Sequence, residues 1–358
     1  MRRSLIGLRI TLAIGVPAVA AIGLSGGAWG QSTTTVPSFQ LPYSSYASPE
    51  AIAMFERWRT QERLPANATI PMSRVFYDRA NTDRVRRMRA IYDVKVVETR
   101  IGGIVVHRVT PTAGIAPENR GRVLINLHGG GFMWGAGSGE LAEAVPIAAV
   151  GKIEVVTVDY RMAPEYRFPA ASEDVATVYK ALLATYPAKS IGIYGCSAGG
   201  ILTGQSVAWF LAHKIPVPGA IGTFCGTVVE FGGDSMYFGA AAEGKAPGTG
   251  LRRIIDTPYF TGARADDPLA FPGVSRAMLS RFPPTLLITG TRDFAMSSVL
   301  RGNELLRAAG VKTELRVWDG MPHAFFVDPE PEESQQAYAA IVRFFHDNLA
   351  APRRPVRR

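Results

Sequence analysis

The sequence predicts an α/β fold in which a mostly parallel, doubly wound sheet of about eight strands carries helices on both faces. Short apolar runs rich in β-branched residues alternate with helical patterns along most of the 358 residues, as buried parallel strands and their crossover helices do. The composition, with 47% hydrophobic and 19% charged residues, is that of a globular protein. One apolar run ends in a serine set between glycines and leads into a helical pattern, which indicates a sharp strand-to-helix turn.

The first 30 residues have the pattern of a secretory signal peptide. Basic Met1-Arg2-Arg3 precedes an apolar run from Ile10 to Leu24, and Ala28-Trp29-Gly30 forms a small-x-small cleavage site. The alternative is an uncleaved membrane anchor, but the apolar run contains Pro17 and is short for a span of roughly 20 residues. We therefore expect an exported protein, periplasmic or secreted, with no stable membrane span after cleavage.

Residues 31–92 predict an irregular arm followed by two cap helices. Ser48-Pro49 offers an N-cap serine and a proline at the first helical position. A second amphipathic run extends from about Ser73 to Ile91. We expect these helices to form a cap together with a later insertion.

Residues 93–348 hold the alternating strands and helices of the main domain. A strand pair around Gly102-Gly103 comes first, and parallel strands with intervening helices follow. The expected strands are Val94–Glu98, Ile104–Val109, Val123–Leu127, Val155–Val158, Ile191–Tyr194, Ala220–Phe224, Thr285–Thr289 and Glu314–Val317. The expected helices lie around Leu141 and Val145 and over Ala171–Leu183, Ile201–His213, Val299–Ala308 and Ser334–Phe345.

Two stretches depart from this pattern. The segment of about 228–275 is rich in small and aromatic residues, shows no clear strand and is too long for an ordinary connection, so we expect a cap insertion there. Residues 349–358 form a basic tail that carries four arginines. Without this tail and the arginines near the first residue, the net charge of +9 falls close to neutrality. A nucleic-acid partner is therefore not expected.

Ser197 is the candidate nucleophile. It lies in Gly195-Cys196-Ser197-Ala198-Gly199, after the strand Ile191–Tyr194 and before a helix. That geometry lifts the hydroxyl above the edge of the sheet, where a base can reach it. A serine that caps the helix is the structural alternative. Ser138 is the other glycine-flanked serine, but no strand precedes it.

A nucleophilic serine needs a base and an acid that orients the base. His323 follows the last strand and precedes the last helix, where a loop lies over the carboxyl edge of the sheet. Asp293 follows the strand that ends at Thr289, which gives the chain order Ser, Asp, His; its alternative role is that of an N-cap. The rival residues are the acids Asp266, Asp267 and Asp319 and the histidines His107, His213 and His346.

A glycine-rich loop follows the strand Val123–Leu127. In His128-Gly129-Gly130-Gly131 the glycines allow backbone amides to converge on one point. The amides of Gly130, Gly131 and Ala198 are the candidate oxyanion hole. A phosphate-binding loop is the alternative, but the Gly-Lys-Ser/Thr ending and the G-x-G-x-x-G spacing are missing.

Together these residues resemble the hormone-sensitive-lipase family of α/β-hydrolases. The resemblance covers about residues 95–348. It implies an α/β-hydrolase fold with a helical cap, hydrolysis of carboxylic esters, and neither a metal nor a cofactor. It also implies that residues 159–165 are a scaffold for the glycine-rich loop and for the turn that carries Ser197. The residues that carry it are His128-Gly129-Gly130-Gly131, Asp159-Tyr160-Arg161-Met162-Ala163-Pro164-Glu165, Gly195-Cys196-Ser197-Ala198-Gly199-Gly200, Asp293 and His323.

Two positions depart from the family pattern. Family members usually have aspartate where Cys196 stands, so we expect the substitution Cys196→Asp to change the pH profile or the stability. They often carry a second acid a few residues after the catalytic one, where this chain has Ser297. Cys196 and Cys225 either form a disulfide or remain buried thiols, and the demanding geometry of a bridge beside a tight turn favours thiols.

The expected substrates are small-molecule esters or lactones with short to medium acyl chains, hydrolysed through an acyl-enzyme. A non-catalytic binding protein on the same fold and an amide hydrolase are the alternatives, and a homodimer is compatible with the sequence. Apolar residues beside the glycine loop and in the insertion are expected to line the pocket, with core packing as the alternative for each: Phe132, Met133, Trp134, Tyr259 and Phe260.

Overall fold

The computed structural model describes residues 40–62, 64–65, 67–242 and 253–350, and those from Leu41 onward form one compact unit. The predicted signal peptide and the last eight residues of the basic tail lie outside the described residues. Among the described helices, none is both long and apolar enough to cross a bilayer.

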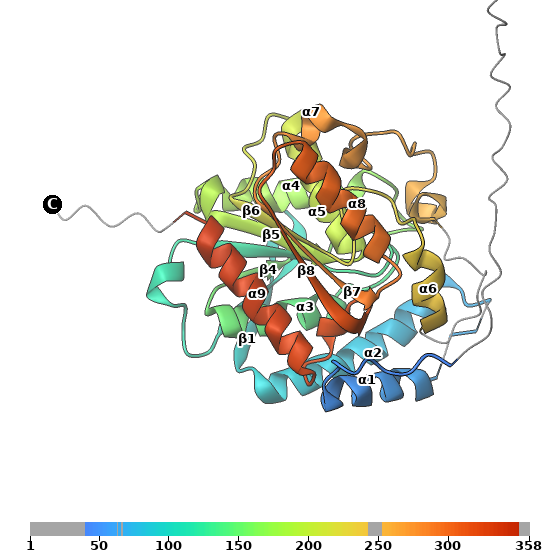
Figure 1. The fold of residues 1–358 in the computed structure, drawn as a ribbon. Coiled ribbons are helices and arrows are strands. Elements are labelled where there is room, and N and C mark those ends of the chain that lie inside the picture. The colour runs from blue at the N-terminus through green and yellow to red at the C-terminus, as the bar shows by residue number, and fades with distance from the viewer. Residues whose placement is uncertain (1–39, 63, 66, 243–252, 351–358) are drawn as a thin grey trace, which may run out of the picture. The chain divides into compact units, whose positions relative to one another are not determined.

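An eight-stranded sheet forms the centre of this unit, in the order β1-β2-β4-β3-β5-β6-β7-β8 (Figure 1). β2 pairs antiparallel with both β1 and β4, and the other neighbours run parallel. This confirms the predicted mostly parallel, doubly wound sheet. The strands are β1 (Val94–Ile101), β2 (Ile104–Pro111), β3 (Val123–Leu127), β4 (Val155–Thr157), β5 (Ile191–Cys196), β6 (Ala220–Phe224), β7 (Thr285–Arg292) and β8 (Thr313–Pro322).

Helices pack on both faces of the sheet (Figure 1). α4, α5 and α8 contribute buried residues to the apolar cluster on one face, and α1, α3 and α9 contribute to the cluster on the other. The helices are α1 (Pro49–Thr60), α2 (Ile70–Ile91), α3 (Ser138–Gly151), α4 (Ala170–Leu182), α5 (Ala198–Ala212), α6 (Ser235–Ala242), α7 (Arg276–Leu279), α8 (Met296–Ala308) and α9 (Glu332–Asn348).

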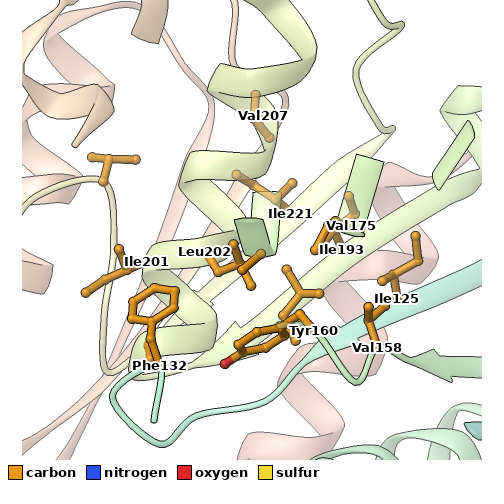
Figure 2. Packing of buried hydrophobic residues seen from close by; sticks show 14 of the residues in the cluster. Ile125, Phe132, Val158, Tyr160, Val175, Ile193, Ile201, Leu202, Val207 and Ile221 are labelled. Carbon is orange, nitrogen blue, oxygen red and sulfur yellow. The ribbon is translucent and has the colours of Figure 1, made fainter. Parts of the chain in front are cut away.

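Successive residues of the central strands point to opposite faces of the sheet. In β5, Ile193 joins the cluster on the α5 side, whereas Tyr194 joins the cluster on the α3 and α9 side. Figure 2 shows Ile193 and Ile221 of the sheet in one layer with Leu202 of α5. Because both faces are covered, these strands consist of nearly continuous apolar residues, which is the pattern that predicts them.

The ends of α1 and α2, the two helices predicted to belong to a cap, follow local sequence signals. Ser48 Oγ accepts the Ala51 N–H at 3.1 Å and Pro49 begins α1, as the sequence predicts. α2 begins at Ile70, three residues before the predicted start, because Thr69 acts as its N-cap. In the described part of the insertion, α6 and short 3-10 turns are present and strands are not, as predicted.

A cluster of charges around Asp328 attaches α1 and α2 to the rest of the unit. The Asp328 side chain is 1% exposed. It accepts hydrogen bonds from Trp58 Nε1 at 2.9 Å and from the Arg87 guanidinium at 2.5 Å, and lies 3.4 Å from Arg84 Nε. Glu330 binds the same Arg87 guanidinium. α1 and α2 are therefore fixed to the segment that follows β8.

The substitution Asp328→Ala should lower the free energy of unfolding by about 3 kcal/mol or more, because it leaves partly buried arginines without their carboxylate. Urea unfolding measures this change. Glu304→Ala is the matched control, since it removes an exposed ion pair with Arg301 on α8 and should have little effect. Equal stability of the two variants would contradict the structural role of Asp328.

Candidate active site

The turn between β5 and α5 holds Ser197 in a strained conformation. Ser197 has φ 58° and ψ −120°, a combination that costs a non-glycine residue about 1–3 kcal/mol. Its N–H donates to the Phe224 carbonyl of β6 at 2.7 Å, so the neighbouring strand fixes the turn. Within the described residues the Ser197 side chain makes no capping bond to α5, which leaves its hydroxyl available for chemistry.

Close backbone contacts surround this turn and require glycine. A Cβ at Gly195 would lie 2.1 Å from the Leu127 carbonyl oxygen, and one at Gly199 would lie 1.8 Å from the same oxygen. A Cβ at Gly226 would lie 2.2 Å from the Ser197 carbonyl oxygen. The sequence motif indicates the first two glycines. The requirement at Gly226 is not visible in the sequence, because it arises between segments that are distant in the chain.

Asp293 and His323 form a hydrogen-bonded pair at the carboxyl ends of β7 and β8, where His323 Nδ1 lies 2.7 Å from Asp293 Oδ1. The buried carboxyl also accepts the Ala295 N–H at 2.8 Å and the Thr289 hydroxyl at 2.7 Å. Burial opposes ionisation, but the His323 ring and these donors outweigh it and hold the Asp293 pKa below its ordinary value. The ionised carboxylate favours a proton on Nδ1, which leaves Nε2 free to act as a base.

Cys225 lies between the serine turn and this pair. It follows Phe224, the residue that accepts the Ser197 N–H. Its sulfur lies within 4.8 Å of ligand atoms of both Asp293 and His323. The three residues predicted from the sequence therefore gather at one edge of the sheet. In the part of the chain that the structure describes, no hydrogen bond joins Ser197 directly to His323.

The loop after β3 carries the predicted oxyanion donors. Gly130 and Gly131 have φ values of 113° and 62°, and a Cβ at Gly130 would lie 1.9 Å from the Trp134 carbonyl oxygen. A Cβ at Gly129 would lie 3.4 Å from the Ser197 Cβ. The loop thus packs directly against the serine turn, and only glycine fits the conformation and the space at Gly130.

Residues 159–165 hold this loop in place, in agreement with the family resemblance. The Tyr160 hydroxyl donates to the His128 carbonyl at 2.7 Å, and the two rings stack with their centroids 4.1 Å apart. The Ala163 N–H donates to the Phe132 carbonyl at 2.8 Å. Both bonds reach the glycine loop and fix its two ends.

Glu143 of α3 contacts both the glycine loop and the serine turn, and sequence reasoning misses this residue. Its Oε1 accepts the Gly129 N–H at 2.9 Å, and its Oε2 accepts the Cys196 N–H at 3.1 Å and the Asn126 amide at 3.2 Å. Burial raises the Glu143 pKa to about 8 in spite of these donors. The sequence contains no signal for this role, because Cys196 lies 53 residues further along the chain.

The residues predicted to line the pocket divide into two groups. Phe132, Tyr259 and Phe260 are at most 1% exposed and pack on one another, with Phe132 stacked on Tyr259 at 4.4 Å. This matches the core-packing alternative, since fully buried rings do not face an open cavity. Met133 and Trp134 are partly exposed and remain the candidates for contact with a substrate.

Phe294 and Ser297 link the insertion to the histidine. Phe294 stacks on the His323 ring with centroids 4.1 Å apart. The Ser235 hydroxyl of α6 donates to the Phe294 carbonyl at 2.7 Å, and Ser235 and Ser297 exchange backbone-to-hydroxyl hydrogen bonds of 3.0 and 2.8 Å. Ser297 therefore attaches α6 to the segment that carries Asp293.

Cys196 and Cys225 are free, buried thiols, as the sequence reasoning favours. Burial raises the pKa of Cys196 to about 11 and that of Cys225 well above its ordinary value, so both stay protonated at neutral pH. One possible metal-ligand atom from each of Cys225, Asp293 and His323 lies within 4.8 Å of the other two. A protonated thiol is a poor ligand, however, and the other two groups bind each other.

The rival residues have structural partners. Ser138 begins α3 and donates to Asp78 Oδ1 at 2.7 Å. His107 Nδ1 lies 2.9 Å from Glu140. The remaining partners are Arg264 for Asp266, the Leu269 N–H for Asp267, Ser44 for Asp319, the Trp209 carbonyl for His213 and Asp347 for His346.

The strand order, the strained serine and the histidine–aspartate pair define this protein as an α/β-hydrolase. The profile of the family described as "alpha/beta hydrolase fold" matches residues 124–327. The chain belongs to that family, and its solved and curated relatives identify the branch.

A solved structure of esterase E25 is 30% identical to this chain, with a TM-score of 0.79, over 89% of this chain and 99% of that one. An esterase of the bacterial hormone-sensitive lipase family is 26% identical, with a TM-score of 0.74, over 85% and 99%. Versiconal hemiacetal acetate esterase of Emericella nidulans is 25% identical over 66% of this chain and 84% of its own length. Carboxylesterase/phospholipase LipF of Mycobacterium tuberculosis is 27% identical over 66% and 64%. The chain is a carboxylic ester hydrolase of the hormone-sensitive-lipase type.

The substitution Cys196→Asp should destabilise the protein, because it adds a buried carboxyl between Glu143 and Asp293, the two acids that already act on the Cys196 thiol. Cys196→Ser is the matched control, since it is uncharged and similar in size. We expect Cys196→Asp to melt several degrees below Cys196→Ser. Equal melting temperatures would show that the buried space tolerates a third acid.

Glu143 should make stability fall as the pH rises. Its carboxyl keeps a proton in the folded protein up to about pH 8, whereas in the unfolded chain it loses that proton near its ordinary pKa of 4.5. Stability therefore decreases through this window, by at most roughly 1.4 kcal/mol per pH unit. In urea unfolding from pH 5 to pH 8, Glu143→Gln should show a flatter dependence than the wild type. Parallel curves would contradict the burial of this acid.

Proposed function

We propose that the protein is a serine esterase that hydrolyses short- to medium-chain acyl esters or lactones through an acyl-enzyme on Ser197. The observation that carries this proposal is the 2.7 Å bond between His323 and a buried, ionised Asp293, next to the strained serine turn. His323 takes the Ser197 proton as the hydroxyl attacks the ester carbonyl. Asp293 keeps the imidazole in the required tautomer and stabilises the imidazolium.

The N–H groups of Gly130, Gly131 and Ala198 bind the oxyanion in this proposal. Its support is the contact between the glycine loop and Ser197, together with the place of Ala198 in the first turn of α5, where helix amides favour negative charge. His323 then protonates the leaving alcohol. A water molecule attacks the acyl-enzyme in the second half of the cycle, with the proton transfers repeated.

A small acyl group is the expected substrate feature. The fully buried rings of Phe132, Tyr259 and Phe260 fill the space beside the glycine loop, which favours short acyl chains over long ones. The acetate ester in the name of the Emericella relative agrees with this expectation. Met133 and Trp134 are the proposed substrate contacts on the exposed side of the loop.

Export of the protein is also part of the proposal. Its support is the signal-peptide pattern of residues 1–30, with cleavage after Gly30. The mass of the protein isolated from a bacterial periplasm would test it, because a mature chain should begin at Gln31. An uncleaved chain in the membrane fraction would favour the anchor instead.

The test of the activity is hydrolysis of p-nitrophenyl acetate, butyrate, octanoate and palmitate. The wild type should prefer acetate or butyrate. Ser197→Ala and His323→Ala should lower kcat by about a million-fold, and Asp293→Asn by about 10,000-fold, because its amide favours the wrong tautomer. Ser138→Ala is the matched control and should retain the wild-type rate.

Three outcomes would contradict the proposal in whole or in part. Full activity in folded Ser197→Ala would place the nucleophile elsewhere. No turnover of any ester by folded wild type would favour the non-catalytic binding protein. A preference for palmitate would leave the mechanism intact but contradict the small acyl pocket.

A further inference from the structure

The Glu143 side chain lies where the pairing of β3 with β5 ends. β3 and β5 pair in parallel, and their last paired residues are Leu127 and Gly195. Beyond this point β3 continues into the glycine loop and β5 into the serine turn. Backbone N–H groups buried at such a divergence need acceptors other than the neighbouring strand.

The two carboxyl oxygens of Glu143 supply these acceptors. Oε1 lies 2.9 Å from the Gly129 nitrogen, one residue before the first proposed oxyanion donor. Oε2 lies 3.1 Å from the Cys196 nitrogen, one residue before Ser197. A single rigid carboxyl group therefore spans the glycine loop and the serine turn and sets the distance between them.

The side chain of Glu143 is itself held in place. It is 6% exposed, and Asn126 of β3 donates to its Oε2 at 3.2 Å. The Tyr194 hydroxyl of β5 donates to the Glu143 backbone carbonyl at 3.1 Å, which fixes this turn of α3 against the sheet. Because helix, strand and carboxyl are all anchored, movement of the glycine loop relative to Ser197 would break a buried hydrogen bond.

We propose that Glu143 is a positioning residue for ester hydrolysis, which keeps the oxyanion donors of the glycine loop in register with Ser197. This inference rests on the proposed serine mechanism. Glu143 does not touch the substrate; it acts through Gly129 and Cys196. Its effect should appear in the transition state, where the oxyanion forms, and hardly in the binding of the substrate.

The substitution Glu143→Gln tests this role. Glutamine keeps the shape of the side chain but offers one acceptor oxygen. Above about pH 8 the wild-type carboxyl is ionised and both of its oxygens accept, whereas glutamine satisfies only one of the two backbone N–H groups and directs its own N–H₂ at the other. We expect kcat for p-nitrophenyl acetate at pH 9 to fall about 10- to 100-fold, less than the roughly 100- to 1,000-fold typical of losing an oxyanion donor outright. KM should stay within about threefold of the wild type.

A second readout distinguishes positioning from a general loss of stability. A trifluoromethyl ketone forms a tetrahedral oxyanion with an active serine, so its inhibition constant should rise by the same factor as kcat falls. Glu154→Gln is the matched control. Glu154 is also a buried acid, bound to Arg108 at 2.6 Å, but it lies at the amino end of β4, away from the carboxyl edge of the sheet. This variant should lose stability and keep kcat.

Several outcomes would overturn the proposal. If Ser197→Ala is inactive, a kcat of Glu143→Gln at pH 9 within twofold of the wild-type value would overturn the proposal. A change confined to KM would also overturn it. If Glu143→Gln does not fold, Glu143→Asp provides the same test, because it keeps both oxygens but withdraws them by one methylene group. Activity that survives Ser197→Ala would instead refute the underlying serine mechanism.

Discussion

The close packing of the ends of β3, β5 and β6 holds Ser197 in a backbone conformation that serine rarely adopts. The Leu127 carbonyl touches the positions of both Gly195 and Gly199, and Gly226 touches the Ser197 carbonyl. No side chain fits at these glycines, and the strain at the serine is stabilised only when all three strand ends are in place. The presentation of the hydroxyl is therefore a property of the assembled sheet and not of the pentapeptide alone.

Groups from outside the sheet fix the loops on either side of this turn. On one side, Tyr160 and Glu143 bind the glycine loop through its backbone. On the other side, Asp328 lies five residues beyond His323 and receives hydrogen bonds from α1 and α2. α1 and α2 thus contribute to the position of the histidine segment. Phe294, stacked on the histidine ring, adds an apolar contact from the segment that carries the acid.

Sequence patterns predict the features of the fold and the site that depend on neighbouring residues in the chain. The buried strands follow from continuous apolar runs, and Ser197, Asp293 and His323 follow from motif and chain order. The sequence cannot indicate Glu143 or Asp328, because each receives its hydrogen bonds from segments that only the folded chain brings together. The sequence also cannot tell which of the expected aromatic residues line the pocket, since a ring beside the site and a ring in the core have the same sequence pattern.

Reaction with an organophosphate, followed by peptide mass spectrometry, shows which serine of the chain is activated as a nucleophile. Diethyl p-nitrophenyl phosphate reacts with a serine that a neighbouring base activates, and it leaves a diethylphosphoryl group on that residue. If Ser197 is the activated nucleophile, one such group per chain forms on Ser197, and esterase activity is lost in proportion to labelling. Labelling of Ser138 or another serine, or an unlabelled Ser197 in a chain that has lost its activity, would contradict this role of Ser197.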